Sequence, residues 1–133
     1  MVFFSMYDII VIGAGVVGCA IARELSRYAL RILVLEREPD LCFGTSGRNS
    51  GVLHAGFNNP PGSLMARFCV EGNREFDRVA RELDVPFRRT GKLVVGFSDS
   101  DRAALERMIA QGRAAGTPGL SIVGRDVLRS LLP

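Results

Sequence analysis

The sequence lacks the features that mark several special classes of protein. No apolar run approaches the roughly 20 residues that span a bilayer, and the first five residues lack the basic segment and the length of a signal peptide. Cys19, Cys42 and Cys69 form neither a CxxC pair nor a metal-ligand spacing. We therefore predict no metal site and no disulfide framework, and an unpatterned odd cysteine count favours a reducing compartment such as the cytoplasm.

Lysine and histidine are also nearly absent. Lys92 is the only lysine among 17 basic residues, and His54 is the only histidine. The net charge of +3 is small and dispersed, which argues against a nucleic-acid partner. The length of 133 residues, with 47% hydrophobic and 23% charged residues, is typical of a globular domain that buries a core.

The most informative segment is a strand, a glycine-rich turn and a helix near the N-terminus. An apolar run ends at Ile12, and Gly13, Gly15 and Gly18 then follow in the GxGxxG spacing. The next apolar run ends on Glu36, at about the distance expected within one βαβ unit. This arrangement predicts binding of the ADP half of a dinucleotide. The alternative is a glycine-rich turn in another kind of α/β domain.

Each residue of the motif has a physical role in that prediction. Gly13 permits the tight turn, Gly15 lets the backbone approach a pyrophosphate, and Gly18 lets the helix pack against the strand. The helix that begins near Val16 directs free N–H groups and its positive dipole end at the phosphates. Glu36 is expected to accept hydrogen bonds from ribose hydroxyls and to disfavour a 2′-phosphate.

Hydrophobic periodicity predicts further elements along the whole chain. Strands are expected at residues 7–12, 31–36, 87–90, 92–97 and 120–123. Helices are expected at residues 16–28, 64–83, 99–115 and 126–132. Ser63 is expected to cap the second helix, Asp99 or Ser100 the third, and Gly72-Asn73 is a point where the second helix is expected to be weak. The polar loop 39–62 is long for a compact domain, and such loops are usually functional.

Further segments carry a family pattern: Thr45-Ser46, the stretch 49–56 (Asn-Ser-Gly-Val-Leu-His-Ala-Gly), residues 61–64 and residues 91–97. Together with the glycine motif they resemble the FAD-dependent oxidoreductases of the D-amino-acid oxidase superfamily. Within it they are most similar to the glycerol-3-phosphate dehydrogenase and L-2-hydroxyglutarate oxidase branch. The resemblance covers nearly the whole chain, and the stretch 49–56 is its most specific part.

The resemblance implies an α/β fold and an incomplete chain. A Rossmann-like FAD-binding βαβ unit is expected in residues 1–84, followed by the beginning of an α+β substrate domain in residues 85–133. The chain resembles an N-terminal fragment, truncated relative to the family. Its parallel sheet then lacks strands, so we expect self-association or a partner chain at the exposed sheet edge.

The resemblance also implies a set of site residues. Thr45 and Ser46 would lie near the FAD phosphates, residues 49–51 would run beside the flavin, and Arg48 would either add positive charge there or be solvated. His54 would accept the proton of a substrate hydroxyl or, alternatively, only shape the pocket. The predicted cofactor-binding residues are Gly13, Gly15, Val17, Gly18, Glu36, Arg37, Thr45, Ser46, Asn49, Ser50 and Gly51.

The function implied is oxidation of a hydroxy acid or a polyol phosphate by hydride transfer to flavin, with the activity of these 133 residues alone left open. The alternatives are a non-catalytic nucleotide-binding fragment, one half of a split enzyme, and a piece without activity. An NAD-binding domain is disfavoured by the loop at residues 49–51. Arg88 and Arg89 are either anion binders or residues of an exposed strand. For the complete enzyme, peripheral association with a membrane is an alternative to a purely cytoplasmic location.

Overall fold

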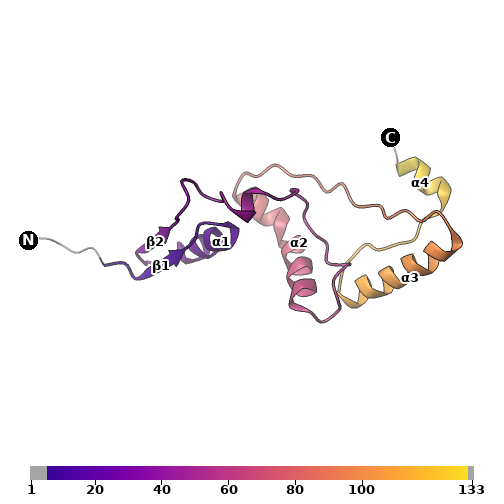
Figure 1. The fold of residues 1–133 in the computed structure, drawn as a ribbon, viewed down its shortest axis with the longest axis horizontal. Helices are drawn as coiled ribbons and strands as arrows, with labels where there is room; N and C mark the ends of the chain where they lie inside the picture. Colours follow the sequence, from indigo (N-terminus) through magenta and orange to yellow (C-terminus); the bar gives the residue numbers. More distant parts are fainter. Residues whose placement is uncertain (1–5, 132–133) are drawn as a thin grey trace, which may run out of the picture. The chain divides into compact units, whose positions relative to one another are not determined.

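The computed structural model describes residues 6–131 and separates them into two compact units, divided in the sequence between Val52 and Leu53. Figure 1 labels the strands and α-helices of both units. The first unit contains β1 (Ile9–Ile12), α1 (Val16–Leu25), β2 (Ile32–Leu35) and the 3₁₀ turn η1 (Thr45–Gly47). The second contains α2 (Leu64–Glu82), α3 (Asp99–Ala114) and α4 (Arg125–Leu131). The domain boundary expected at residue 84 concerns the complete protein and stays a prediction.

The two strands of the first unit form a parallel pair, as the βαβ pattern predicts. Ile9 lies opposite Ile32, and Ile12 lies opposite Leu35. The strands therefore end at the same level, and α1 connects them (Figure 1). Because the residues that follow both strands emerge at one edge of the sheet, the glycine turn and Glu36 come together there.

The first unit buries few of its apolar side chains. Ala14 is 0% exposed and Val11 is 8% exposed, whereas Ile10 and Ile12 of the same strand are 53% and 86% exposed. A parallel sheet is usually covered on both faces. The face of β1 that carries Ile10 and Ile12 is therefore largely uncovered within residues 6–131.

Helix α2 begins where the sequence predicts. The Ser63 hydroxyl accepts a hydrogen bond from the Ala66 amide at 3.1 Å, which confirms Ser63 as the N-cap. The helix continues through Gly72 as one element, although glycine weakens a helix interior. Its buried side is formed by Ala66, Val70 and Ala80.

Helix α3 begins at Asp99, as the expected range 99–115 has it, but its N-cap is Ser98 rather than Asp99 or Ser100. The Asp101 carboxylate accepts hydrogen bonds from the amides of Phe97 and Ser98, both at 2.9 Å. These bonds, that from Phe97 first, lower the pKa of Asp101. The acidic residue three positions after a serine is the sequence signal for this cap, in the manner of a capping box.

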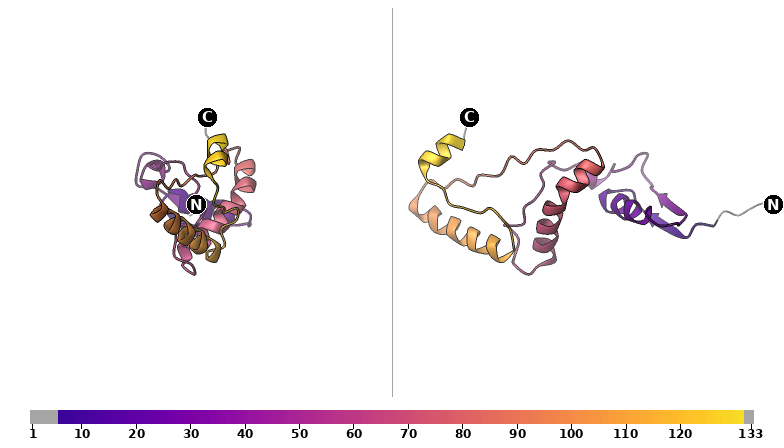
Figure 2. Two further views of the ribbon diagram at one scale, coloured as in Figure 1. Left: turned by 90° about the vertical axis from the view of Figure 1, so that its right-hand side faces the viewer. Right: turned by 180° about the vertical axis from the view of Figure 1, so that it is seen from behind.

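Three of the predicted strands are wrong. The structure places residues 87–90, 92–97 and 120–123 in loops, and Figure 2 shows the first two ranges within the segment that connects α2 with α3. A strand needs a neighbouring strand to satisfy its backbone groups, and these described segments have none. Phe87 packs on a helix instead of pairing with a strand. Its ring contacts the Phe76 ring of α2 edge to face, with the ring centroids 5.1 Å apart.

Candidate dinucleotide-binding site

The turn after β1 has the geometry that a dinucleotide motif needs. Gly13 adopts a φ of +97°, a conformation that strains any residue with a Cβ, and its amide donates to the Leu35 carbonyl at 2.7 Å. Gly18 faces this turn from α1. A Cβ built on Gly18 would lie 1.9 Å from the Gly13 carbonyl oxygen, so only hydrogen fits there. The predicted close packing of helix on strand is therefore present.

The first amides of α1 form a cluster of donors. The Val16 amide donates to the Ser46 hydroxyl at 2.9 Å. Within the described residues, the amides of Val17 and Gly18 have no hydrogen-bond acceptor, as is usual in the first turn of a helix. Free N–H groups together with the positive end of the helix dipole form an anion-binding site. Gly15 leaves this site open, because a Cβ there would lie 3.1 Å from the Ser46 hydroxyl oxygen.

Ser46 contributes a further donor. A hydroxyl group can donate one hydrogen bond and accept two. Ser46 uses one acceptor position for the Val16 amide, and the loop 42–48 holds it above the start of α1. Its hydroxyl hydrogen is then available for an anion at the same place, which fits the predicted role beside a phosphate.

Glu36 links the end of β2 to the glycine turn. Its Oε2 accepts the Ala14 amide at 2.7 Å, and its Oε1 accepts the amides of Arg37 and Glu38 at 2.8 Å and 3.0 Å. These hydrogen bonds, that from Glu38 first and that from Ala14 next, hold the pKa of Glu36 below its ordinary value of 4.5. A carboxylate offers about four lone-pair positions, so about one remains for a ligand hydroxyl.

The loop that contains the other predicted residues is organised by Asn49. The side-chain amide of Asn49 donates to the Ser46 carbonyl at 2.5 Å and accepts the Gly51 amide at 2.8 Å. Gly51 has a φ of +65° and is exposed, like Ser50 and Thr45. The Asn49 side chain therefore fixes the loop, and the backbone at residues 50–51 is presented outward.

Two arginines near the site are engaged locally. Arg37 forms an ion pair with Glu38 at 3.1 Å and remains 90% exposed. The guanidinium of Arg48 donates to the Phe43 carbonyl and lies 5.4 Å from the centroid of the Phe43 ring. Arg48 is thus neither a freely solvated side chain nor one committed to an anion.

Sequence reasoning missed the role of Ala14 and Cys42. Ala14 donates its amide to Glu36 and accepts the Cys42 amide at 3.0 Å on its carbonyl. The thiol groups of Cys19 and Cys42 approach the same carbonyl at 3.3 Å and 3.6 Å. Burial, and then the neighbouring Cys19, raise the pKa of the Cys42 thiol. The GxGxxG pattern specifies only the glycines, so no signal in it identifies Ala14.

His54 belongs to the second unit, where its side chain is exposed and its carbonyl accepts a hydrogen bond from the Asn73 side chain at 3.2 Å.

Of the predicted site residues, the first unit brings these together around the start of α1: Gly13, Gly15, Val17, Gly18, Glu36 and Ser46. Arg89 is not available as an anion binder, because its guanidinium is bonded to Asp77 and Asn73.

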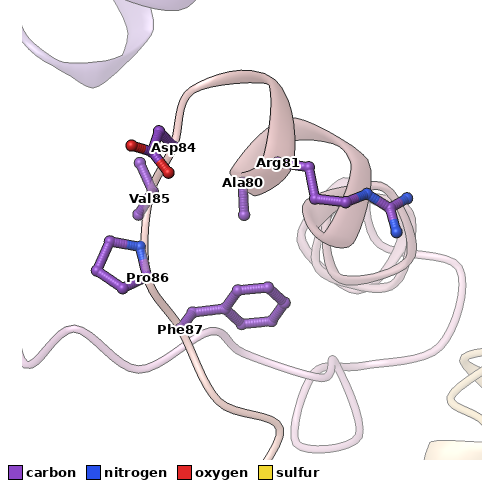
Figure 3. A pocket seen from close by; sticks show the side chains of 6 residues that line it. All are labelled: Ala80, Arg81, Asp84, Val85, Pro86 and Phe87. Carbon is purple, nitrogen blue, oxygen red and sulfur yellow. The ribbon is translucent and has the colours of Figure 1, made fainter.

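Two pockets lie in the second unit. One, of about 450 Å³, is an open hollow where α2 ends, lined by Ala80, Arg81, Asp84, Val85, Pro86 and Phe87. Figure 3 shows the loop turning there and the Phe87 side chain below the helix end. The hollow contains none of the predicted site residues and belongs to the packing of the turn. The second pocket, of about 380 Å³, is lined by residues from Ala55, α2 and the loops at Arg89 and Thr117.

Residues 6–131 contain neither a membrane-spanning helix nor a cluster of metal-binding side chains. No helix in this range has both the length and the hydropathy to cross a membrane. The same range holds no group of three or more histidine, cysteine, aspartate or glutamate side chains placed to bind a metal ion.

Comparison with known proteins gives a consistent result. A family described as FAD dependent oxidoreductase matches residues 8–133. The chain is 41% identical over 128 residues to a glycerol 3-phosphate dehydrogenase of Caloramator mitchellensis, covering 96% of this chain and 27% of the relative. It is 34% identical over 131 residues to the human mitochondrial L-2-hydroxyglutarate dehydrogenase, covering 97% of this chain and 28% of the relative.

A solved structure is similar as well. The dithionite-reduced L-α-glycerophosphate oxidase of Mycoplasma pneumoniae, with FAD bound, matches with a TM-score of 0.69 and 32% identity. The match covers 82% of this chain and 29% of that protein. The chain thus spans less than a third of the length of these relatives.

Proposed function

The chain belongs to the FAD dependent oxidoreductase family that matches its residues 8–133, and from this premise we propose that its first unit binds the ADP half of FAD. We propose further that the complete protein oxidises a hydroxy acid or a polyol phosphate by hydride transfer to the flavin. One observation carries the proposal: donors at the start of α1 and the Glu36 carboxylate lie together where two parallel strands end.

The residues present fit a dinucleotide. The free amides of Val17 and Gly18 and the Ser46 hydroxyl hydrogen would bind the pyrophosphate. The remaining lone pair of Glu36 would accept one ribose hydroxyl, and its negative charge would repel a 2′-phosphate. Because nothing lies within 4 Å of a Cβ position on Gly13, the turn leaves room on that side. FAD rather than NADP is the cofactor that this arrangement favours.

When bound, FAD supplies the acceptor for the hydride and passes the electrons onward. The chain contributes orientation and proton transfer. Residues 49–51, whose backbone Asn49 holds outward, would lie beside the flavin ring. His54 would accept the proton of the substrate hydroxyl as the C–H bond breaks, and it is the only histidine among these 133 residues.

The substrate class comes from the relatives. Glycerol 3-phosphate and L-2-hydroxyglutarate, which two of the relatives are named for, both carry a hydroxyl group near an anionic group. We infer the same combination for this protein. The groups that hold the anion are not among the predicted site residues, and Arg89 is engaged with α2.

The test is an absorbance spectrum of the purified chain, recorded before and after addition of FAD and removal of the excess. We expect flavin bands that remain with the protein. The retained flavin should then be reduced by glycerol 3-phosphate or by L-2-hydroxyglutarate under anaerobic conditions if the chain has catalytic activity. A colourless protein that retains no FAD would overturn cofactor binding by this chain.

A second candidate is favoured by the exposed apolar residues of β1. Ile10 and Ile12 are exposed, although parallel sheets are normally covered. In this reading the chain is a non-catalytic nucleotide-binding part of a larger assembly, and a partner chain or a second copy covers the sheet. Flavin retention only in the presence of a partner chain would support it over an independently active chain.

A further inference from the structure

All three residues of the segment 54–56 are fixed by hydrogen bonds or close packing within the second unit. The His54 carbonyl accepts a hydrogen bond from the Asn73 side chain at 3.2 Å. The Ala55 carbonyl accepts one from the hydroxyl of Thr117, a residue that is only 6% exposed, at 3.1 Å. Gly56 packs directly on α2, where an added Cβ would lie 2.9 Å from a methyl group of the helix. The backbone that carries the only histidine is therefore fixed.

Asn73 is itself held in one orientation. Arg89 donates through Nη1 to the Asn73 side-chain oxygen at 2.8 Å and through Nη2 to the Asn73 carbonyl at 2.7 Å. Because the amide oxygen faces Arg89, the amide nitrogen is left to face His54. The hydrogen bonds from Arg89 thus fix the orientation of the Asn73 side-chain amide, and no contact with the His54 imidazole is needed for this.

Arg89 is in turn anchored to the same face of α2. Its Nε donates to both carboxylate oxygens of Asp77, at 3.1 Å and 3.0 Å, and Nη2 also bonds to that carboxylate. The Arg89 hydrogen bond lowers the pKa of Asp77. Phe87 lies 5.6 Å from the guanidinium and packs against Phe76. A single exposed ion pair contributes little, but a bidentate arginine with several fixed partners also sets geometry.

We propose that Asn73 is a positioning residue for His54, and that Arg89 and Asp77 hold Asn73 in the orientation that this role needs. The inference rests on the proposed function, in which His54 accepts a proton. A proton acceptor works only within hydrogen-bond distance of the group it serves, and small displacements of catalytic geometry are costly. Asn73 acts on the backbone of His54, so its effect is on the placement of the imidazole.

The test uses carbonyl and amide NMR resonances of the 133-residue chain, in which His54 gives the single histidine signal set. Asn73→Asp keeps an oxygen for Arg89 and replaces the donor to His54 with a carboxylate oxygen, which also adds a negative charge. We expect an upfield shift of the His54 carbonyl carbon and a shift of the Ala55 amide, with unchanged circular dichroism. Arg88→Ala, an exposed neighbour of Arg89, is the matched control and should leave both resonances in place.

A second variant keeps the test decisive if Asn73→Asp does not fold. Arg89→Lys retains the charge but loses the planar fork that contacts Asn73 and Asp77 together, and it should shift the same resonances of His54. Unchanged resonances in the folded variants, or random-coil shifts of residues 54–56 in the wild-type chain, would overturn the proposal. FAD retention is measured separately on the same samples. A chain that binds no flavin would refute the proposed function, whereas the NMR shifts of His54 and Ala55 could still be interpreted, because they do not depend on bound FAD.

Discussion

The Glu36 carboxylate accepts the backbone amide of Ala14 at 2.7 Å, across 22 positions of sequence. This bond joins the residue that follows β2 to the turn that follows β1. The acidic residue of the motif thus has a structural role in the protein itself, in addition to the role proposed for it toward the ribose. One carboxylate thus orders the turn and keeps about one lone pair for the proposed ribose contact.

Replacement of Glu36 by glutamine should weaken FAD binding by about tenfold or more, because hydrogen bonds to a charged acceptor are stronger than those to a neutral one. The side-chain NH2 group of the glutamine would also face the backbone amides that donate to the Glu36 carboxylate, so two donors would oppose each other. Titration of the variant with FAD, followed by flavin fluorescence, measures the loss. Glu38→Gln is the control, since the half-buried Glu38 carboxylate pairs only with Arg37 among the described residues. Equal affinity of both variants would contradict the role of Glu36.

The stability of the chain should depend on pH through Glu36. Its pKa in the folded protein lies below the ordinary value of 4.5, so the folded state holds the carboxylate ionised more strongly than the unfolded state does. The stabilisation is therefore fully present above pH 4.5 and is lost as the pH falls below that value. Urea denaturation of the wild type and Glu36→Gln between pH 3 and 7 should show a difference that shrinks with acidification. A constant difference would refute this link.

Gly18→Ala should destabilise the first unit by about 1–3 kcal/mol or more, because the new Cβ would overlap the Gly13 carbonyl. FAD retention should fall with it, since the turn must move. Gly72→Ala is the matched control: that glycine also lies in a helix, but nothing lies within 4 Å of its Cβ position. It should stabilise the protein by about 0.5–1 kcal/mol. Chemical denaturation of the two variants gives the comparison, and the same sign for both would count against the packing argument.

Ser46→Ala should reduce FAD affinity while leaving most of the fold intact. The substitution removes both the acceptor for the Val16 amide and the donor proposed for the phosphate. Ser26→Ala tests the opposite end of α1, where the hydroxyl donates to the Arg23 carbonyl at 2.7 Å. The affinity loss should be confined to Ser46→Ala, as measured by equilibrium dialysis with FAD. An equal loss in Ser26→Ala would mean that helix stability, rather than the anion site, is responsible.

Local patterns predict the elements of the first unit and the start of α2 in the second. The β1–α1–β2 order follows from apolar runs and glycine spacing within about thirty residues, and the Ser63 cap follows from one hydroxyl beside a helical pattern. Helices and their caps depend on interactions between residues that are close in sequence. A short segment of the chain is therefore enough to predict them. The site residues of the glycine motif come together for the same reason.

The strands expected at residues 87–90 and 92–97 do not form. Their sequence pattern shows a side-chain preference for strand, but it does not identify a neighbouring strand to pair with. Phe87 and Val94 have the side chains of a strand, but pairing depends on other strands, and here the ring of Phe87 packs on α2 instead. The contacts of Ala14, Cys42 and Asn73 are equally invisible in the sequence. Each joins a backbone group to a side chain 19 to 28 positions away, a separation over which a local sequence pattern gives no signal.

Position 14 shows what such backbone bonding means for sequence change. Ala14 is fully enclosed, its amide is held by Glu36, and its carbonyl receives the Cys42 amide. No hydrogen bond of Ala14 depends on its side chain, yet the enclosure leaves space for little more than a methyl group. A codon library at this position, selected for flavin retention, should return alanine and glycine. The variable letter of the GxG motif is therefore among the least tolerant positions of the chain.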